Sequence, residues 1–70
     1  NNPVVVSALI DALLKDGKDE VRLEAASSLG AMLAEKALPA LWQAARQDRH
    51  DAVRQAAREA ALKIEAFCEK

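Results

Sequence analysis

The stretch DGKDEVR at residues 16–22 returns 32 positions later as DRHDAVR at residues 48–54. Both copies have aspartate at the first and fourth positions and end in a Val-Arg pair. The same offset relates Ala25 to Ala57 downstream of the two stretches. A fixed period of this length is typical of repeat proteins, in which one small helical unit stacks on the next.

The composition favours an all-α chain. The 70 residues are 51% hydrophobic, but much of that fraction is alanine, and the only aromatic residues are Trp42 and Phe67. Only two glycines and two prolines are present, which argues against a loop-rich or all-β domain. Strong helix formers dominate the remainder. A chain of this length has room for one small unit with a modest core.

Four helices are predicted from apolar residues at helical spacing. We expect them at about residues 3–15, at 19 to 34 or 35, from about 38 or 39 to 47, and from 51 to 67 or 68. Their expected apolar faces are Val6, Leu9, Ile10, Leu13 and Leu14; Val21, Ala25, Leu29, Met32 and Leu33; Leu38, Leu41, Trp42 and Ala45; and Val53, Ala57, Ala60, Ala61, Ile64 and Phe67 or Cys68.

Polar residues and prolines mark where the helices should begin. Asn2, Asp19 and Asp51 are expected as N-caps, because their side chains can accept from backbone N–H groups two or three residues later. Pro39 suits the first turn of the third helix, where no intrahelical N–H bond is lost.

Three segments resemble a known family. VRLEAASSLG at residues 21–30 resembles the second-helix signature of HEAT repeats, most closely the short variety named after phycobilisome (PBS) lyases. VRQAAREAALKI at residues 53–64 is the second copy, and ALPAL at residues 37–41 resembles the family's first-helix opening. The resemblance implies an α-α superhelix (solenoid) of two antiparallel helix hairpins.

The resemblance also implies a domain organisation. We expect one HEAT-like domain over residues 1–70, with repeat one at about 3–35 and repeat two at about 36–68. The sequence begins at Asn1 without methionine, so it is expected to be a piece of a longer chain. Leu62 stands where the first repeat has Gly30. Terminal repeats are usually more polar, so this departure leaves open a third repeat or a partner covering that end.

The resemblance implies a structural role for the charged residues near the turns. In HEAT repeats such aspartates and arginines form a ladder from one repeat to the next. The resemblance therefore implies that Asp16, Arg22, Asp48 and Arg54 pair with one another or cap backbone groups. A catalytic role for these charged pairs is the weaker alternative.

The sequence offers little for catalysis. His50 lies in a turn without a second histidine for a metal site, and we expect it to be solvated. Cys68 is the single cysteine and is expected to be a small buried hydrophobe. Trp42 is expected to make a core or inter-repeat contact. We therefore predict no enzyme activity, no cofactor and no metal.

The charge is divided between the two halves. Residues 1–35 have three basic and six acidic side chains, whereas residues 36–70 have seven basic and five acidic ones. The basic residues of the second repeat give an alternative function, binding of a nucleic-acid backbone, without an aromatic platform or phosphate loop to support it. These residues are Arg46, Arg49, Arg54 and Arg58. No segment has the length and apolarity of a membrane span.

The preferred hypothesis is a protein-interaction or scaffold module that presents a rigid helical surface. Its expected partner surface is Glu24, Ser27, Ser28, Ala31, Glu59, Lys63 and Ala66. A bilin lyase or lyase subunit is the enzymatic alternative, implied by the PBS-lyase resemblance. A designed consensus repeat is a further alternative, which departures such as Leu62 and Trp42 disfavour. The lone cysteine fits a reducing compartment, so a cytoplasmic location is expected.

Self-association is also expected, either end to end or as a symmetric homodimer. Two repeats fall short of the roughly three that solenoids need for stability, and the predicted terminal faces are apolar. The residues expected on those faces are Val4, Val5, Val6 and Leu14 at one end, and Leu62 and Phe67 at the other.

Overall fold

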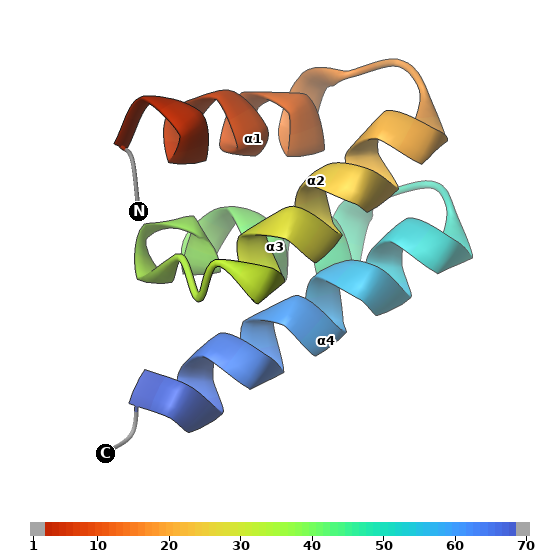
Figure 1. The fold of residues 1–70 in the computed structure, drawn as a ribbon. Coiled ribbons are helices and arrows are strands. Elements are labelled where there is room, and N and C mark those ends of the chain that lie inside the picture. Colours follow the sequence, from red (N-terminus) through yellow and green to blue (C-terminus); the bar gives the residue numbers. More distant parts are fainter. Residues whose placement is uncertain (1–2, 69–70) are drawn as a thin grey trace.

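The computed structural model describes residues 3–68 and contains four α-helices (Figure 1). A short 3₁₀ helix, η1, precedes the third α-helix, and no strand is present in the described residues. The prediction of an all-α chain is therefore confirmed. The elements are α1 (Pro3–Lys15), α2 (Asp19–Ala31), η1 (Glu35–Ala37), α3 (Leu38–Gln47) and α4 (Asp51–Cys68).

The helices form two stacked hairpins. α1 packs on α2 in the first hairpin, and α3 packs on α4 in the second. α2 and α4 lie side by side, so the second helices of the two hairpins supply the main interface between them (Figure 1). The turns at residues 16–18 and 48–50 lie at the same end of the molecule, which brings the two copies of the repeated motif together (Figure 1).

The core combines a few large side chains with many alanines. Its largest fully buried residues are Leu13, Leu29, Leu41, Val53 and Ile64. Alanine contributes little apolar area but allows helices to approach closely. The closest approach is at Gly30 of α2, where a Cβ atom would lie 2.8 Å from the Cβ of Ala60 on α4. Close α2–α4 packing therefore depends on the absence of a side chain at residue 30.

α2 ends at Ala31, earlier than the predicted end at residue 34 or 35. Met32 is its C-cap, and Leu33 has a φ of 53°, in the left-handed region. The N–H of Leu33 donates to the carbonyl of Gly30, and the N–H of Ala34 donates to the carbonyl of Leu29. These two bonds form a Schellman motif, which satisfies the last helical carbonyls and stops the helix. Sequence reasoning missed this end because leucine replaces the usual glycine.

The predicted caps at Asp19 and Asp51 are wrong. Each aspartate is the first residue of its helix, and the N-cap of α2 is Lys18, which makes no side-chain cap bond. The polar side chains that close these turns lie three residues earlier, at Asp16 and Asp48. Pro39 lies in the first turn of α3, as predicted. The predicted cap at Asn2 lies outside the described residues.

Several predicted apolar positions differ in burial. Val21, expected on an apolar helix face, is exposed, whereas Val6, expected on an open terminal face, is buried. The other residues expected on the terminal faces are exposed: Val4, Val5, Leu14, Leu62 and Phe67. Val21 lies on the side of the first hairpin that faces away from the second, so no helix among residues 3–68 covers it fully. Phe67 lies in the last turn of α4, which continues beyond the part that packs on the shorter α2.

Candidate functional site

A buried ion pair joins the two hairpins at their turns. The guanidinium of Arg22 donates from Nε to Asp48 Oδ2 at 2.7 Å and from Nη2 to Asp48 Oδ1 at 3.1 Å. Both side chains are only 6% exposed. Nη1 of Arg22 also donates to the backbone carbonyl of Asp16 at 2.8 Å. One side chain from the first repeat thus ties its own turn to the turn of the second.

The same pattern of bonds occurs within each repeat. The carboxylate of Asp16 accepts from the N–H of Lys18, and that of Asp48 accepts from the N–H of His50, both at 2.9 Å. Arg54 donates from Nη1 to the carbonyl of Asp48 at 2.6 Å, as Arg22 does to Asp16. The two repeats differ in the carboxylate that each arginine binds. Arg22 reaches the carboxylate of the next turn, whereas Arg54 pairs with Asp51 of its own helix.

The electrostatics of this group indicate a stabilising pair. Burial alone would raise the pKa of Asp48, but the hydrogen bonds from Arg22 and the His50 N–H, with the arginine charge, lower that pKa below its usual value. The hydrogen bond to Asp48 likewise raises the pKa of Arg22. A carboxylate held ionised by a bidentate arginine has little tendency to accept a proton, so this arrangement is suited to fixing the turns.

Two candidate residues, His50 and Cys68, have environments that differ from, or add to, the expectations. His50 is exposed, but its Nδ1 lies 3.1 Å from Nη2 of Arg22, so the ring borders the ion pair. Cys68 is exposed, which contradicts its predicted burial. Its thiol donates to Glu35 at 2.9 Å, a bond that raises the pKa of the thiol. Such a thiol is a weak nucleophile.

Trp42 packs partly buried against the core, and its indole N–H donates to Glu65 Oε2 at 2.9 Å. The bond crosses from α3 to α4 within the second hairpin. Because its indole N–H is hydrogen-bonded and its ring packs against the core, Trp42 serves as a packing residue.

The residues of the predicted partner surface do not lie together in the structure. Four of its residues line a shallow groove of about 170 Å³ between α2 and α4, together with the small residues Gly30, Ala56 and Ala60. Those four are Ser27, Ala31, Glu59 and Lys63. Glu24 lines a different cleft, between α1 and α2, and Ser28 is half-buried. Ala66 is exposed on the last turns of α4, outside the groove lining.

Sequence reasoning missed the floor of the groove. Ala60 is expected on the apolar face of its helix, and it does lie against Gly30, but the small size of Gly30, Ala56 and Ala60 also leaves a depression between the helices. The spacing of small residues one turn apart on facing helices is the sequence signal that could have indicated it.

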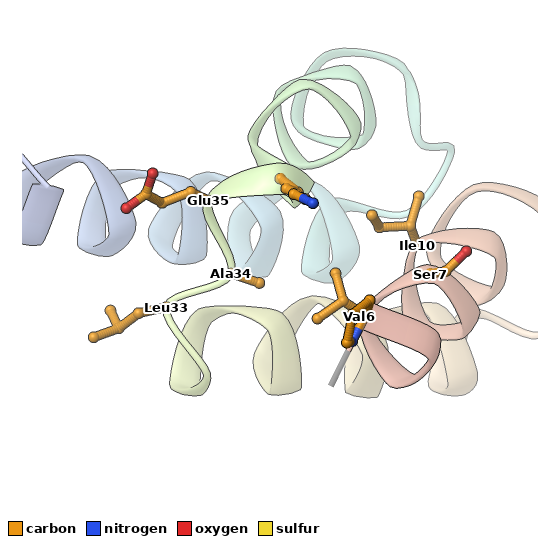
Figure 2. A pocket seen from close by; sticks show the side chains of 8 residues that line it. Val6, Ser7, Ile10, Leu33, Ala34 and Glu35 are labelled. Atoms are coloured by element: carbon orange, nitrogen blue, oxygen red, sulfur yellow. The ribbon is translucent and has the colours of Figure 1, made fainter. Parts of the chain in front are cut away.

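A second, larger cleft was also missed. It has a volume of about 520 Å³ and lies between the first half of α1 and the connection from α2 to η1 (Figure 2). Val6, Ser7 and Ile10 of α1 line one side, and residues 33–36 line the other. This connection exists because α2 ends at Ala31. The sequence analysis predicts that the helix continues to residue 34 or 35, and a helix of that length would leave no such cleft to predict.

The basic residues of the second repeat differ in exposure. Arg46, Arg49 and Arg58 are exposed, whereas Arg54 is half-buried and engaged at the turn. Within residues 3–68, no cluster of three or more histidine, cysteine or acidic side chains could hold a metal ion. No helix in that range is long and apolar enough to cross a membrane.

Two antiparallel helix hairpins, stacked through their second helices and tied at their turns, define an α-hairpin repeat protein. A family model described as HEAT repeats matches residues 1–62. The chain therefore belongs to the HEAT repeat family, as the sequence resemblance predicted. Searches of curated proteins and of solved structures returned no significant match. HEAT repeats generally mediate protein–protein interaction or scaffolding and are generally non-catalytic.

Proposed function

We propose that this chain binds a protein partner along the groove between α2 and α4. The main supporting observation is the groove itself, whose floor is made of Gly30, Ala56 and Ala60 and whose rim has both charges, Glu59 and Lys63. Small residues leave the backbone of both helices close to the surface, so an extended segment or a helix of the partner can approach it. The opposite charges of Glu59 and Lys63, one turn apart on α4, would orient that segment.

The rigidity of the surface comes from the turn network, formed by Asp16, Arg22, Asp48, His50 and Arg54. Arg22 fixes the turn of one hairpin to that of the other, and Ala60 is in direct contact with α2 at Gly30. A groove between two helices keeps its shape only if the helices do not slide. Because the helices are pinned, binding costs little conformational entropy.

The test uses capture of a partner followed by matched surface variants. Partner proteins or displayed peptides are selected against the wild-type chain, and their affinity is then measured for Ser27→Arg and for Gln43→Arg. Both positions are exposed, but Ser27 lines the groove and Gln43 lies on α3. We expect Ser27→Arg to weaken binding at least about tenfold, since a large side chain fills the groove, and Gln43→Arg to leave it unchanged. Equal affinities for the two variants would exclude the groove.

Two alternatives have direct tests with the same proteins. Bilin transfer to an apoprotein by this chain would favour the lyase hypothesis. Binding of a nucleic acid that weakens with salt and is lost in Arg58→Glu would favour a nucleic-acid backbone as the ligand. The half-buried position of Arg54 leaves only part of the predicted basic group available for that role.

A further inference from the structure

The first hairpin has an open face at positions that are covered in the second hairpin. A cleft of about 260 Å³ between α1 and α2 is lined by an acidic and an apolar set of residues. This surface, called the N-terminal face below, consists of Leu9, Ala12, Glu20, Val21, Glu24 and Ala25. Val21 is 38% exposed, whereas its repeat equivalent Val53 is fully buried. The difference arises because the first hairpin covers the second, while nothing in the described residues covers the first.

The second hairpin has the opposite open face. The positions of α2 that meet α4, such as Ala26 and Gly30, are buried. Their equivalents on α4 are Arg58, which is exposed, and Leu62, which is 50% exposed. The C-terminal face, defined here as Arg54, Arg58 and Leu62, is therefore the surface on which a following hairpin would stack.

At the two open faces, the turn network presents a hydrogen-bond acceptor and a hydrogen-bond donor. The acceptor, Asp16, is on the N-terminal side and the donor, Arg54, is on the C-terminal face. Asp48 accepts from Arg22 of the preceding repeat, but across from the Asp16 carboxylate there is no arginine within residues 3–68. Arg54 holds the carbonyl of its own turn as Arg22 does, but its other contact is the 93% exposed Asp51. Asp16 and Arg54 are thus the acceptor and the donor of a second pair like Arg22–Asp48, which forms once within residues 3–68.

The internal interface predicts which residues of two copies would meet. Within the chain, Arg22 binds Asp48 and Gly30 lies against Ala60. If a second copy stacks on the C-terminal face in the same way, the first partner of each pair moves 32 residues along the chain and the second moves 32 residues back. Arg54 of one copy then lies at Asp16 of the next. The same shift places Leu62 at Ser28. Arg58 and Glu24 lie one helical turn before these two residues and face each other. The charges on the two faces are therefore complementary, acidic at the N-terminal face and basic at the C-terminal face.

Leu62 does not fit this register well. At the equivalent internal position, even a single Cβ on Gly30 would lie 2.8 Å from the Cβ of Ala60. A leucine at this position would hold the two neighbouring helices apart. We propose that copies of this chain associate head to tail through the C-terminal and N-terminal faces, and that Leu62 keeps this association weak. Because each copy offers both faces, the contact does not close at a dimer.

Sedimentation equilibrium from micromolar to millimolar concentrations tests the proposal. The average mass of the wild-type chain is expected to rise above 7.6 kDa with concentration, and the rise should be smaller at high salt. Glu24→Arg and Arg58→Glu, both at exposed positions, should each stay monomeric. An equal mixture of the two variants should associate again, because the acidic faces of one then meet the basic faces of the other.

A second substitution separates this register from simple hydrophobic association. Leu62→Gly should lower the concentration needed for association by about tenfold, since it recreates the Gly30 contact. Glu59→Gly is the matched control, because it imposes the same cost on helix α4 at a position outside the C-terminal face. Weaker association of Leu62→Gly would overturn the proposed register. A dimer insensitive to both charge reversals, or a wild-type chain that remains a monomer throughout, would overturn head-to-tail association itself.

Discussion

Replacing Asp48 with alanine should destabilise the fold far more than removing an exposed carboxylate. The substitution removes three accepted hydrogen bonds, two from Arg22 at 2.7 and 3.1 Å and one from the N–H of His50 at 2.9 Å. It also leaves the guanidinium, 6% exposed, without its counter-ion. Arg22 keeps its bond to the carbonyl of Asp16, which limits the loss.

The expected magnitude follows from these contacts. Hydrogen bonds to charged groups are worth about 1.5–3 kcal/mol, and Arg22 keeps its bond to the carbonyl of Asp16, so we expect a net loss of about 2–3 kcal/mol. In a domain of this size each kcal/mol lowers the melting temperature by about 4–8 °C, which gives a decrease of about 10–20 °C. Thermal unfolding followed by circular dichroism measures it.

Asp11→Ala is the matched control. Asp11 lies on α1, is 68% exposed, and makes only a long ion pair of 3.9 Å with Lys15. Its removal should change stability by less than about 0.5 kcal/mol. Asp48→Asn should fall between the two variants, because an amide oxygen can still accept from the His50 N–H. Equal unfolding midpoints for Asp48→Ala and Asp11→Ala would refute the role assigned to the ion pair.

Three further outcomes follow from single contacts. Because the pKa of Asp48 is lowered in the folded state, its stabilising contribution is present above its unfolded pKa and is lost as pH falls through the folded one. The gap in unfolding free energy between wild type and Asp48→Ala should therefore narrow from about pH 7 to about pH 2 in urea titrations; a constant gap would contradict the shift. Gly30→Ala should lower stability by about 1–2 kcal/mol despite alanine's better helix propensity, because its Cβ would overlap Ala60, and adding Ala60→Gly should recover part of the loss. Trp42→Phe should cost about 1 kcal/mol through the lost bond to Glu65, and Glu65→Ala should cost less in the Phe background than in the wild type.

The sequence predicted the parts of the fold that depend on periodicity. The 32-residue offset and the apolar spacing led to four helices in two hairpins, because a stacked repeat repeats its contacts as well as its residues. The paired turns at residues 16–18 and 48–50 could be anticipated for the same reason. The resemblance implied that Arg22 and Asp48 belong to one network, and in the structure they form a bidentate pair.

The details that escaped prediction depend on tertiary contacts. The end of α2 rests on Leu33 adopting a left-handed conformation, which leucine seldom does and which no local pattern indicates. Val21 and Val53 occupy equivalent positions, yet only the second is buried, because burial depends on a neighbouring hairpin. The exposure of Cys68 follows from the length of α4 relative to α2, which the apolar spacing does not define.

The central claim is that the groove between α2 and α4 is the surface that binds a protein partner. Its most direct test is an NMR titration of the ¹⁵N-labelled chain with a selected partner peptide, following the backbone amide of every residue. The account predicts that the largest shifts cluster at Ser27, Ala31, Glu59 and Lys63, the residues that line the groove with Gly30, Ala56 and Ala60. Shifts concentrated on α1 and residues 33–36, around the larger cleft, would contradict it.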